Sequence, residues 1–474
     1  MPGPGLLTRR AAVSSAAAAV AAPWSSVQAA GEPVTILRVQ RTSLEVNRKP
    51  ASRLTITQPD GRQGMMTAVG RQFRTRVENR LDVPTLIHWH GLAPPWQQDG
   101  VPEVSSPPIA PGASAEYDFP LGFGGTFWMH SHQGFQEQEL LAAPLIISDG
   151  RDRPGQQDVV LMLADFSFTP PEQIYADLRK PMPGNMATGK MAMGGAGPGM
   201  DASAAPDLND VKYDAFLAND RTLDDPEVIR VRTGGTVLLR IINSSSMSAY
   251  HIDLGALQGE LIAVDGFQVQ PVGGRRFPIA VAQRLDIRVR LPNDPAAHPV
   301  LAVLEGERNQ TGIILRGGKA PVRRLPAMAA KPSTALTLDL ERRLRAAAPL
   351  ASRKPDRVHQ LDLTGSMSGY IWSINNVAWT KDTPPLPIAK GERVELVFRN
   401  QTPMPHPMHL HGHTFQVVEI DGERFPGALR DTVLVPPKSR VVVAFDADNP
   451  GWWALHCHLL YHLEAGMFTT LRYV

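Results

Sequence analysis

The sequence predicts an all-β protein made of three Greek-key β-sandwich domains. Three observations carry this prediction: the length of 474 residues, the abundance of turn-forming residues and an internal repeat. A chain of this length suggests about three domains of roughly 150 residues each. It contains 43 prolines and 40 glycines, which suit many turns between short strands better than long helices.

The repeat is a segment that begins at a glycine and ends at an asparagine nine residues later. It occurs three times, at residues 70–79, 234–243 and 391–400. Each copy shows partial period-two alternation, which predicts a strand followed by a turn at the asparagine. The three copies predict three sandwich domains, at residues 33–150, 151–335 and 340–474.

Residues 1–30 have the features of an export signal. Arg9-Arg10 precede a weakly apolar run at 11–22, and residues 27–29 form an acceptable cleavage site. The paired arginines favour the twin-arginine (Tat) route, although an ordinary secretory signal or an unstructured tail also fits. No later stretch has the ~18 apolar residues of a membrane span. We therefore expect a periplasmic protein without a membrane span.

Charge and cysteine content exclude two classes of protein. The net charge is only +2 and no basic stripe with interleaved aromatic residues is present, which argues against nucleic-acid binding. The single cysteine, Cys457, excludes an intramolecular disulfide framework. Cys457 is therefore a buried inert thiol, a reactive thiol or a metal ligand.

Histidines fall at equivalent positions in the first and third copies of the repeat. Nine and eleven residues after its asparagine, the first copy has His88 and His90, and the third copy has His409 and His411. The second copy has two aliphatic residues there. A further His-X-His pair follows in each of the same two domains, at 130–132 and 456–458.

This pattern predicts a metal cluster between the first and third domains, with the second domain as a spacer. Alternate residues of a strand point to one face, so each pair directs two imidazoles the same way, about 6–7 Å apart at the backbone. Imidazole suits copper, iron, nickel and zinc. A core or solvent-facing role would explain one histidine, but it does not explain four pairs placed by a repeat.

The third domain carries a second predicted metal site. His406, Cys457, His462 and Met467 stand where the first domain has Thr85, Ser131, Gln136 and Leu141. Two histidines, one cysteine and a weak axial methionine form the ligand set of a blue-copper site. Cys457 and its two neighbours point to opposite faces of one strand. An electron could therefore cross from this site to the cluster by a short covalent path.

The motifs resemble those of the multicopper oxidases over essentially the whole mature chain. They are His88-Trp-His90-Gly, His130-Ser-His132, His406-Pro-Met-His409-Leu-His411-Gly and His456-Cys457-His458-Leu-Leu-Tyr-His462, closing at Met467. The resemblance implies three cupredoxin domains and four copper ions: one type 1, one type 2 and two type 3. It implies type 1 ligands at His406, Cys457, His462 and Met467, and type 2 ligands at His88 and His409. The implied type 3 ligands are His90, His130, His132, His411, His456 and His458.

The resemblance also implies an activity. A small reductant is oxidised at type 1 copper, and dioxygen is reduced to water at a trinuclear cluster. Within the family, three features are most similar to those of periplasmic oxidases of the copper-resistance protein A type: the run at 135–138, the run at 207–211 and the Tat-like signal. This similarity favours Cu(I) as the reductant, with phenols and aromatic amines as further substrates. Alternatives are a broad laccase, a manganese oxidase or a periplasmic copper-sequestering protein. A scaffold relative that lost its metals conflicts with the complete ligand set. We expect a monomer.

Three acids are candidates for supporting roles. Asp99, just after the first histidine motif, is the candidate proton donor near the cluster, and the alternative is a turn-forming residue before Gly100. Asp431 is expected near the type 1 site, as similar segments are in relatives. Glu464 is a weaker candidate.

Five methionines lie in one stretch, at Met182, Met186, Met191, Met193 and Met200, within the loop that we expect at 181–205. Thioethers prefer Cu(I), so this loop could collect cuprous ion, and the alternative is a flexible linker. Met404 is a second possible entry ligand. Thr402 beside it is a poor metal ligand where some cuprous-oxidising relatives carry an acid.

Overall fold

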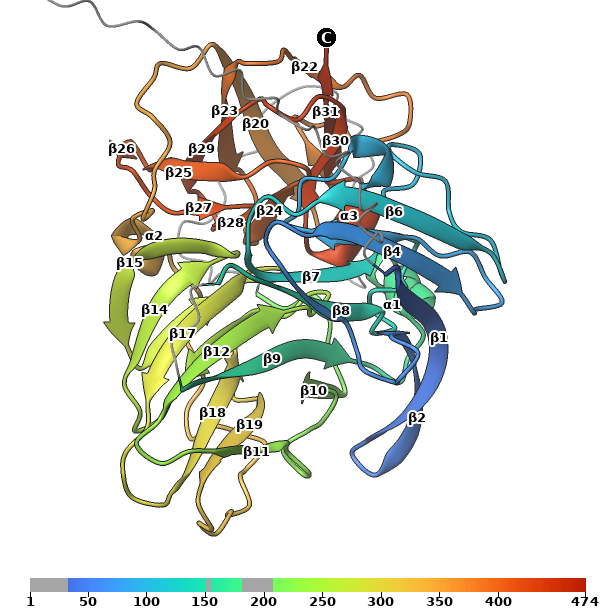
Figure 1. Ribbon diagram of the computed structural model, residues 1–474. Coiled ribbons are helices and arrows are strands. Elements are labelled where there is room, and N and C mark those ends of the chain that lie inside the picture. The colour runs from blue at the N-terminus through green and yellow to red at the C-terminus, as the bar shows by residue number, and fades with distance from the viewer. Residues whose placement is uncertain (1–32, 151–154, 181–207) are drawn as a thin grey trace, which may run out of the picture. The chain divides into compact units, whose positions relative to one another are not determined.

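The computed structural model describes residues 33–150, 155–180 and 208–474 (Figure 1). It confirms the all-β prediction, because nearly all regular structure in these residues is strand. The α-helices in them are short: α1 (Pro171–Leu178), α2 (Asp339–Arg343) and α3 (Leu460–Glu464). None of these helices has the length and apolarity to cross a bilayer. The predicted signal at 1–30 and the methionine-rich stretch at 181–205 lie outside the described residues.

The first two sheets have the strand orders β2-β1-β4-β6 and β3-β8-β7-β5. Their strands are β1 (Thr35–Val46), β2 (Lys49–Thr57), β3 (Met65–Ala68), β4 (Gln72–Asn79), β5 (Ile87–His90), β6 (Ser114–Pro120), β7 (Gly125–Ser131) and β8 (Ala142–Ser148), with a 3-10 turn at Trp96–Gln98. Phe73 and Val77 of one sheet and Phe127 and Met129 of the other belong to one buried cluster, so the two sheets form a sandwich.

The next two sheets have the orders β10-β9-β12-β17-β14-β15 and β11-β19-β18-β13-β16. Their strands are β9 (Gln156–Phe166), β10 (Ala215–Ala218), β11 (Val228–Val231), β12 (Thr236–Asn243), β13 (Tyr250–Asp253), β14 (Gly259–Val264), β15 (Phe267–Gly274), β16 (Arg276–Ile279), β17 (Arg284–Arg290), β18 (Ala297–Leu304) and β19 (Gln310–Gly317). These sheets form the second sandwich.

The last two sheets have the orders β21-β20-β23-β29-β25-β26, with β27 beside β25, and β22-β31-β30-β24-β28. Their strands are β20 (Arg357–Ser366), β21 (Ile371–Ile374), β22 (Leu386–Ile388), β23 (Arg393–Asn400), β24 (His406–Leu410), β25 (Phe415–Ile420), β26 (Glu423–Arg424), β27 (Leu429–Arg430), β28 (Thr432–Val435), β29 (Arg440–Asp446), β30 (Trp452–Cys457) and β31 (Phe468–Tyr473). These sheets form the third sandwich, with buried residues of both in one cluster. The domain boundaries predicted above stay a prediction.

The three repeat copies are the strands β4, β12 and β23, and they occupy equivalent places. Each pairs in parallel with the first strand of its sandwich and antiparallel with a later strand. At the end of each copy, the Oδ1 atom of Asn79, Asn243 or Asn400 accepts the N–H two residues further on, at 2.9, 3.2 and 2.8 Å. These asparagine turns, which the sequence predicted, start the chain toward β5, β13 and β24.

Candidate metal centres

Eight histidines from the first and third sandwiches lie together. They are His88, His90, His130, His132, His409, His411, His456 and His458. Within the sheets, His88 is the register partner of His130, and His409 is that of His456. Between the sandwiches, the rings of His90 and His409 stack with centroids 3.8 Å apart. The structure therefore brings together the four His-X-His pairs that the repeat predicted to meet.

The ring nitrogens are close enough to share metal ions. Nitrogens within 4.8 Å of one another occur in the groups His88–His409–His411, His88–His90–His130 and His132–His411–His456. The Nε2 atoms of His132 and His458 are buried and accept or donate no hydrogen bond within the described part of the chain. Buried polar atoms normally have partners, so these nitrogens fit metal ligation.

In four of these rings the protein holds the outer nitrogen, which sets the tautomer. The Nδ1 atoms of His88, His409 and His456 donate to the backbone oxygens of Asp99, Asp431 and Cys457, each at 2.9 Å. Their Nε2 atoms are therefore left for a metal. His90 is reversed, because its Nε2 donates to Asp431 Oδ1 at 3.1 Å and its Nδ1 faces inward.

In eight of the ten predicted histidine ligands, burial favours the neutral imidazole, which is the form that binds metal. Desolvation lowers the pKa well below the ordinary histidine value for His90, His130, His132, His406, His409, His411 and His458. It lowers the pKa of His456 to about 4. Desolvation also raises the pKa of the Cys457 thiol, so formation of the thiolate needs a cation to take the place of the proton.

The second predicted site lies at the other face of β30. The Cys457 Sγ atom is 3.6 Å from His406 Nδ1 and 3.9 Å from His462 Nδ1, and all three side chains are buried. Met467 is also buried, and its backbone oxygen accepts the Cys457 N–H at 3.0 Å. Strand β24 starts at His406, β30 ends at Cys457 and α3 carries His462. Two imidazoles and a thiol, together with a buried methionine whose backbone is bonded to that of Cys457, fit a blue copper ion.

Comparison with known proteins agrees with this donor set. Profiles of the multicopper oxidase family match residues 63–152, 158–317 and 352–474. The multicopper oxidase MmcO of Mycobacterium tuberculosis is 33% identical over 86% of this chain and 80% of its own length. The chain belongs to the multicopper oxidase family. Copper resistance protein A of Escherichia coli is 27% identical to this oxidase, over 85% of the chain and 86% of its own.

Solved structures show the same fold as the oxidase. The crystal structure of Fet3p, a multicopper oxidase that functions in iron import, aligns with a TM-score of 0.77 at 22% identity, covering 92% of this chain and 90% of its own. A laccase from Botrytis aclada aligns with a TM-score of 0.72 at 21% identity, covering 93% and 88%. The sandwiches are therefore cupredoxin-like.

Of the three acids singled out in the sequence, two lie at the cluster. The Asp99 Oδ2 atom accepts from His411 Nδ1 at 2.8 Å, and its Oδ1 is 3.2 Å from His88 Nδ1. The expectation that Asp431 lies near the type 1 site is wrong, because its carboxylate contacts His90. Glu464 is exposed at the end of α3. Asp431 directly precedes Thr432, the register partner of His409 in the pairing of β24 with β28, so this acid lies beside the cluster.

Glu137 was missed by the sequence analysis. Its carboxylate oxygens lie 2.9 Å from His130 Nδ1 and 3.8 Å from His458 Nδ1, and burial raises the pKa of this carboxyl well above its ordinary value. It lies five residues after His132 and has no counterpart in the third copy of the repeat. The only available signal was an acid in the Phe-Gln-Glu-Gln run.

A second group that the sequence analysis missed surrounds His462. Its Nε2 atom donates to Asp210 Oδ2 at 3.0 Å, and the same oxygen accepts the Tyr370 hydroxyl at 2.6 Å. The Trp372 ring stacks on the imidazole with centroids 4.0 Å apart. Asp210 Oδ1 is buried without a hydrogen bond among the described residues. At the other histidine, Thr402 Oγ1 lies 2.7 Å from His406 Nε2.

The equivalent of the type 1 site in the first sandwich is filled by hydrogen bonds. Gln136 Oε1 accepts the hydroxyls of Thr85 and Ser131, each at 2.8 Å, and its amide donates to Pro84 O. These side chains are buried. In the first sandwich this place therefore holds a buried, hydrogen-bonded cluster instead of the histidines and the cysteine of the third sandwich.

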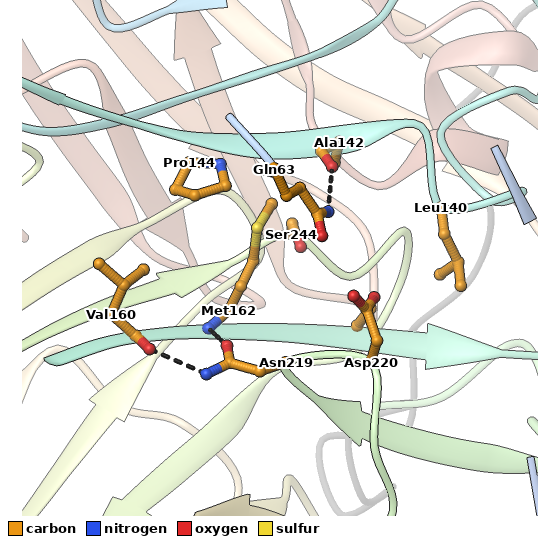
Figure 2. Close-up of a pocket in the computed structure, with 10 residues that line it drawn as sticks. Gln63, Leu140, Ala142, Pro144, Val160, Met162, Asn219, Asp220 and Ser244 are labelled. Carbon is orange, nitrogen blue, oxygen red and sulfur yellow. Dashed lines mark hydrogen bonds between the residues drawn. The ribbon is translucent and has the colours of Figure 1, made fainter. Parts of the chain in front are cut away.

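One cavity, of about 190 Å³, lies apart from both centres (Figure 2). It is lined by residues of the first and second sandwiches and by none of the twelve predicted ligands. Its polar side chains are used internally: Gln63 donates to Ala142 O, and Asn219 bonds Val160 and Met162 backbone atoms. We assign no ligand to it.

Proposed function

We propose that this oxidase couples one-electron oxidation of a small reductant, Cu(I) foremost, to reduction of dioxygen to water. One copper ion would be held by His406, Cys457, His462 and Met467, and three by the eight clustered histidines in the type 2 and type 3 roles predicted above. Bound copper supplies the electron transfer and the oxygen chemistry. Membership of the family supports an oxygen-using oxidoreductase.

The observation that carries the proposal is the position of Cys457 between the two centres. Its sulfur faces His406 and His462, while its chain neighbours His456 and His458 belong to the histidine cluster. The covalent path between the centres is therefore a few bonds long. Storage of copper alone would not require this linkage. Asp99, which contacts histidines of both domains, is our candidate for the group that delivers protons to oxygen reduction.

Asp210 supports Cu(I) as the reductant. Its carboxylate contacts His462 directly and keeps one buried oxygen without a partner in the described structure. The sequence shortly before it holds the five methionines of the 181–205 stretch. Carboxylate and thioether groups are both copper ligands, and thioethers favour Cu(I). An electron given up beside Asp210 would have only one imidazole to cross before reaching the type 1 site.

The test compares oxygen uptake by the copper-loaded protein with Cu(I) and with a simple phenol as sole reductant. We expect faster uptake with Cu(I), and a selective loss of about tenfold or more in Asp210→Asn and after deletion of 181–205. Asp214→Asn, an exposed acid four residues further on, is the control. Preference for phenol, with Cu(I) oxidation unharmed by either change, would favour the broad laccase. Copper well above four ions per chain would favour sequestration.

We further propose periplasmic action in copper tolerance, after export by the Tat route, and a monomeric state. The relatives named copper resistance protein A support a role in copper tolerance. The twin arginine at 9–10 supports export by the Tat route. Cell fractionation with and without a functional Tat system tests the location, and retention in the periplasm without Tat would contradict the route.

A further inference from the structure

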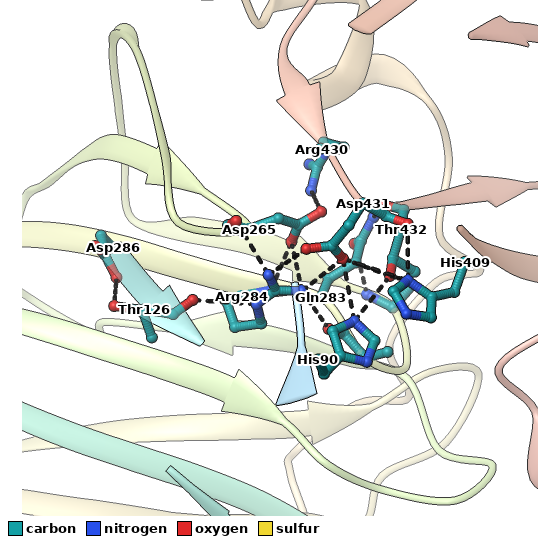
Figure 3. A network of polar contacts seen from close by, with 12 residues as sticks. His90, Thr126, Asp265, Gln283, Arg284, Asp286, His409, Arg430, Asp431 and Thr432 are labelled. Atoms are coloured by element: carbon teal, nitrogen blue, oxygen red, sulfur yellow. Dashed lines mark hydrogen bonds and ion pairs between the residues drawn. The ribbon is translucent and has the colours of Figure 1, made fainter. Parts of the chain in front are cut away.

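Arg284, the first residue of β17, is a buried cation with every donor satisfied (Figure 3). Its Nε donates to Thr126 O at 3.2 Å, and its Nη1 and Nη2 atoms donate to Ala282 O and Asp265 O at 3.1 and 3.0 Å. The two remaining N–H groups bind both carboxylate oxygens of Asp431, at 2.8 Å to Oδ1. A guanidinium has five donors, so this side chain has one possible orientation.

Asp431, which Arg284 holds in place, accepts hydrogen bonds from two histidines of the cluster. Its Oδ1 accepts from His90 Nε2 at 3.1 Å, and its backbone oxygen accepts from His409 Nδ1 at 2.9 Å. The Thr432 hydroxyl, which donates to Asp431 Oδ1 at 2.9 Å, lies 3.2 Å from His409 Nδ1. One of these histidines comes from the first sandwich and the other from the third. Asp431 therefore accepts a hydrogen bond from the outer nitrogen of each ring.

The ion pairs continue away from the cluster. Asp265 Oδ2 accepts from Arg430 Nη1 at 3.0 Å, and Arg430 Nε donates to Glu341 Oε2 at 2.9 Å. All five charged side chains of this network, Asp265, Arg284, Glu341, Arg430 and Asp431, are buried. Two of them belong to the second sandwich. Buried charges require good partners, so this network holds its members at fixed positions.

We propose that Arg284 is a positioning residue for the trinuclear copper cluster: through Asp431 it sets the ring orientations of His90 and His409. The second sandwich, which carries none of the predicted ligands, thus determines how ligands of the other two sandwiches face each other. This inference rests on the proposed function. It gives the second sandwich a role beyond that of the spacer predicted from the sequence.

Gly91 and Gln283 support the same role independently. A Cβ atom on Gly91 would lie 2.6 Å from Arg284 Nη2 and 2.7 Å from Asp431 Oδ2, and its φ is +88°. The glycine that follows His90 in the motif therefore leaves the space that the ion pair occupies. Gln283, next to Arg284, donates its amide to Thr432 O at 3.2 Å.

The test compares Arg284→Lys with Arg240→Lys after copper loading. Lysine keeps the charge but not the two parallel bonds to a carboxylate. Arg240 on β12 is a matched control, because it is also buried, donates to Thr126 Oγ1 and pairs with Asp158 and Asp286. The readouts are bound copper per chain, the electron paramagnetic resonance of type 2 copper, the near-ultraviolet band of the type 3 pair and the blue band of type 1 copper.

We expect Arg284→Lys to weaken cluster copper binding about tenfold and to alter the type 2 and type 3 signals while the blue band is retained. Arg240→Lys should keep all signals. Unchanged cluster signals in Arg284→Lys, or equal losses in both variants, would overturn the inference. If the wild type itself shows no cluster copper, the proposed function fails as well, so the two failures are distinguishable.

A second variant covers the case in which Arg284→Lys does not fold. The double change Arg284→Gln with Asp431→Asn removes both charges together, so it leaves neither member of the pair as an unpaired ion. We expect this protein to fold and to show the same selective change in the cluster signals. Wild-type cluster signals in the double variant would contradict a positioning role.

Discussion

Replacement of Asp99 by asparagine tests whether this acid serves oxygen reduction or only the turn before Gly100. The Oδ2 atom accepts from His411 Nδ1 at 2.8 Å, and Oδ1 is 3.2 Å from His88 Nδ1, so the side chain links ligand candidates of two sandwiches. Its backbone oxygen separately accepts from His88 Nδ1 at 2.9 Å. Asparagine preserves the shape and this backbone contact but removes the charge and the exchangeable acid.

The expected size of the effect follows from the hydrogen bond that is weakened. A hydrogen bond to a charged group contributes about 1.5–3 kcal/mol, and about 1.4 kcal/mol corresponds to a tenfold change in rate. Because His88 keeps its backbone partner, we expect full copper loading. Oxygen reduction should slow by about 10- to 100-fold.

The assay is reoxidation of the fully reduced, copper-loaded protein by dioxygen, together with steady-state oxygen uptake across pH. Copper is counted in the same samples. Asp118→Asn on β6, an exposed acid of the first sandwich, is the control and should behave as wild type. Unchanged turnover of Asp99→Asn at every pH would refute a role in proton delivery and leave Asp99 as a turn residue.

Two further predictions concern stability. Burial raises the pKa of Glu305, which accepts the Leu336 N–H, from 4.5 to about 7, so the folded protein holds this proton more tightly than the unfolded chain. The free energy of unfolding should therefore fall by up to about 3 kcal/mol as pH rises from about 4.5 to about 7. Unfolding experiments at several pH values should show that Glu305→Gln removes this dependence. The same pH dependence in the variant would contradict the prediction. Gln136→Leu removes the acceptor of the Thr85 and Ser131 hydroxyls, and should lower the stability of the copper-free protein by about 1–3 kcal/mol with copper content unchanged. Loss of copper would show that the first sandwich does hold metal at this place.

Much of the fold and of the metal sites could be predicted because the evidence is periodic and local. The glycine-to-asparagine repeat marks β4, β12 and β23, and the same counting places His88 and His409 at equivalent points. Strand geometry alone then directs alternate histidines to one face. The third copy has Cys457, His406, His462 and Met467 where the first copy has no such residues. This difference predicted that these four residues form a site distinct from the histidine cluster.

Apart from Asp99, the groups around the ligands could not be predicted, because nothing in the local sequence marks them. Asp210 is 252 residues from His462, and Glu137 has no equivalent in the other copies. The position of Asp431 was predicted wrongly, because it was inferred from similar segments in relatives, whereas the register of β24 against β28 sets it beside the cluster.

The amino-acid sequence thus indicated which side chains meet at the two predicted metal sites and which repeat segments lead into them, since both follow from spacing along the chain. Only the tertiary structure decided which groups orient those side chains. Arg284 and Asp431 are 147 residues apart and belong to different sandwiches, yet two hydrogen bonds between them hold a histidine from a third part of the chain. Such contacts form only when the sheets pack together. A buried charge needs a partner of opposite charge, and packing can supply that partner from any part of the chain.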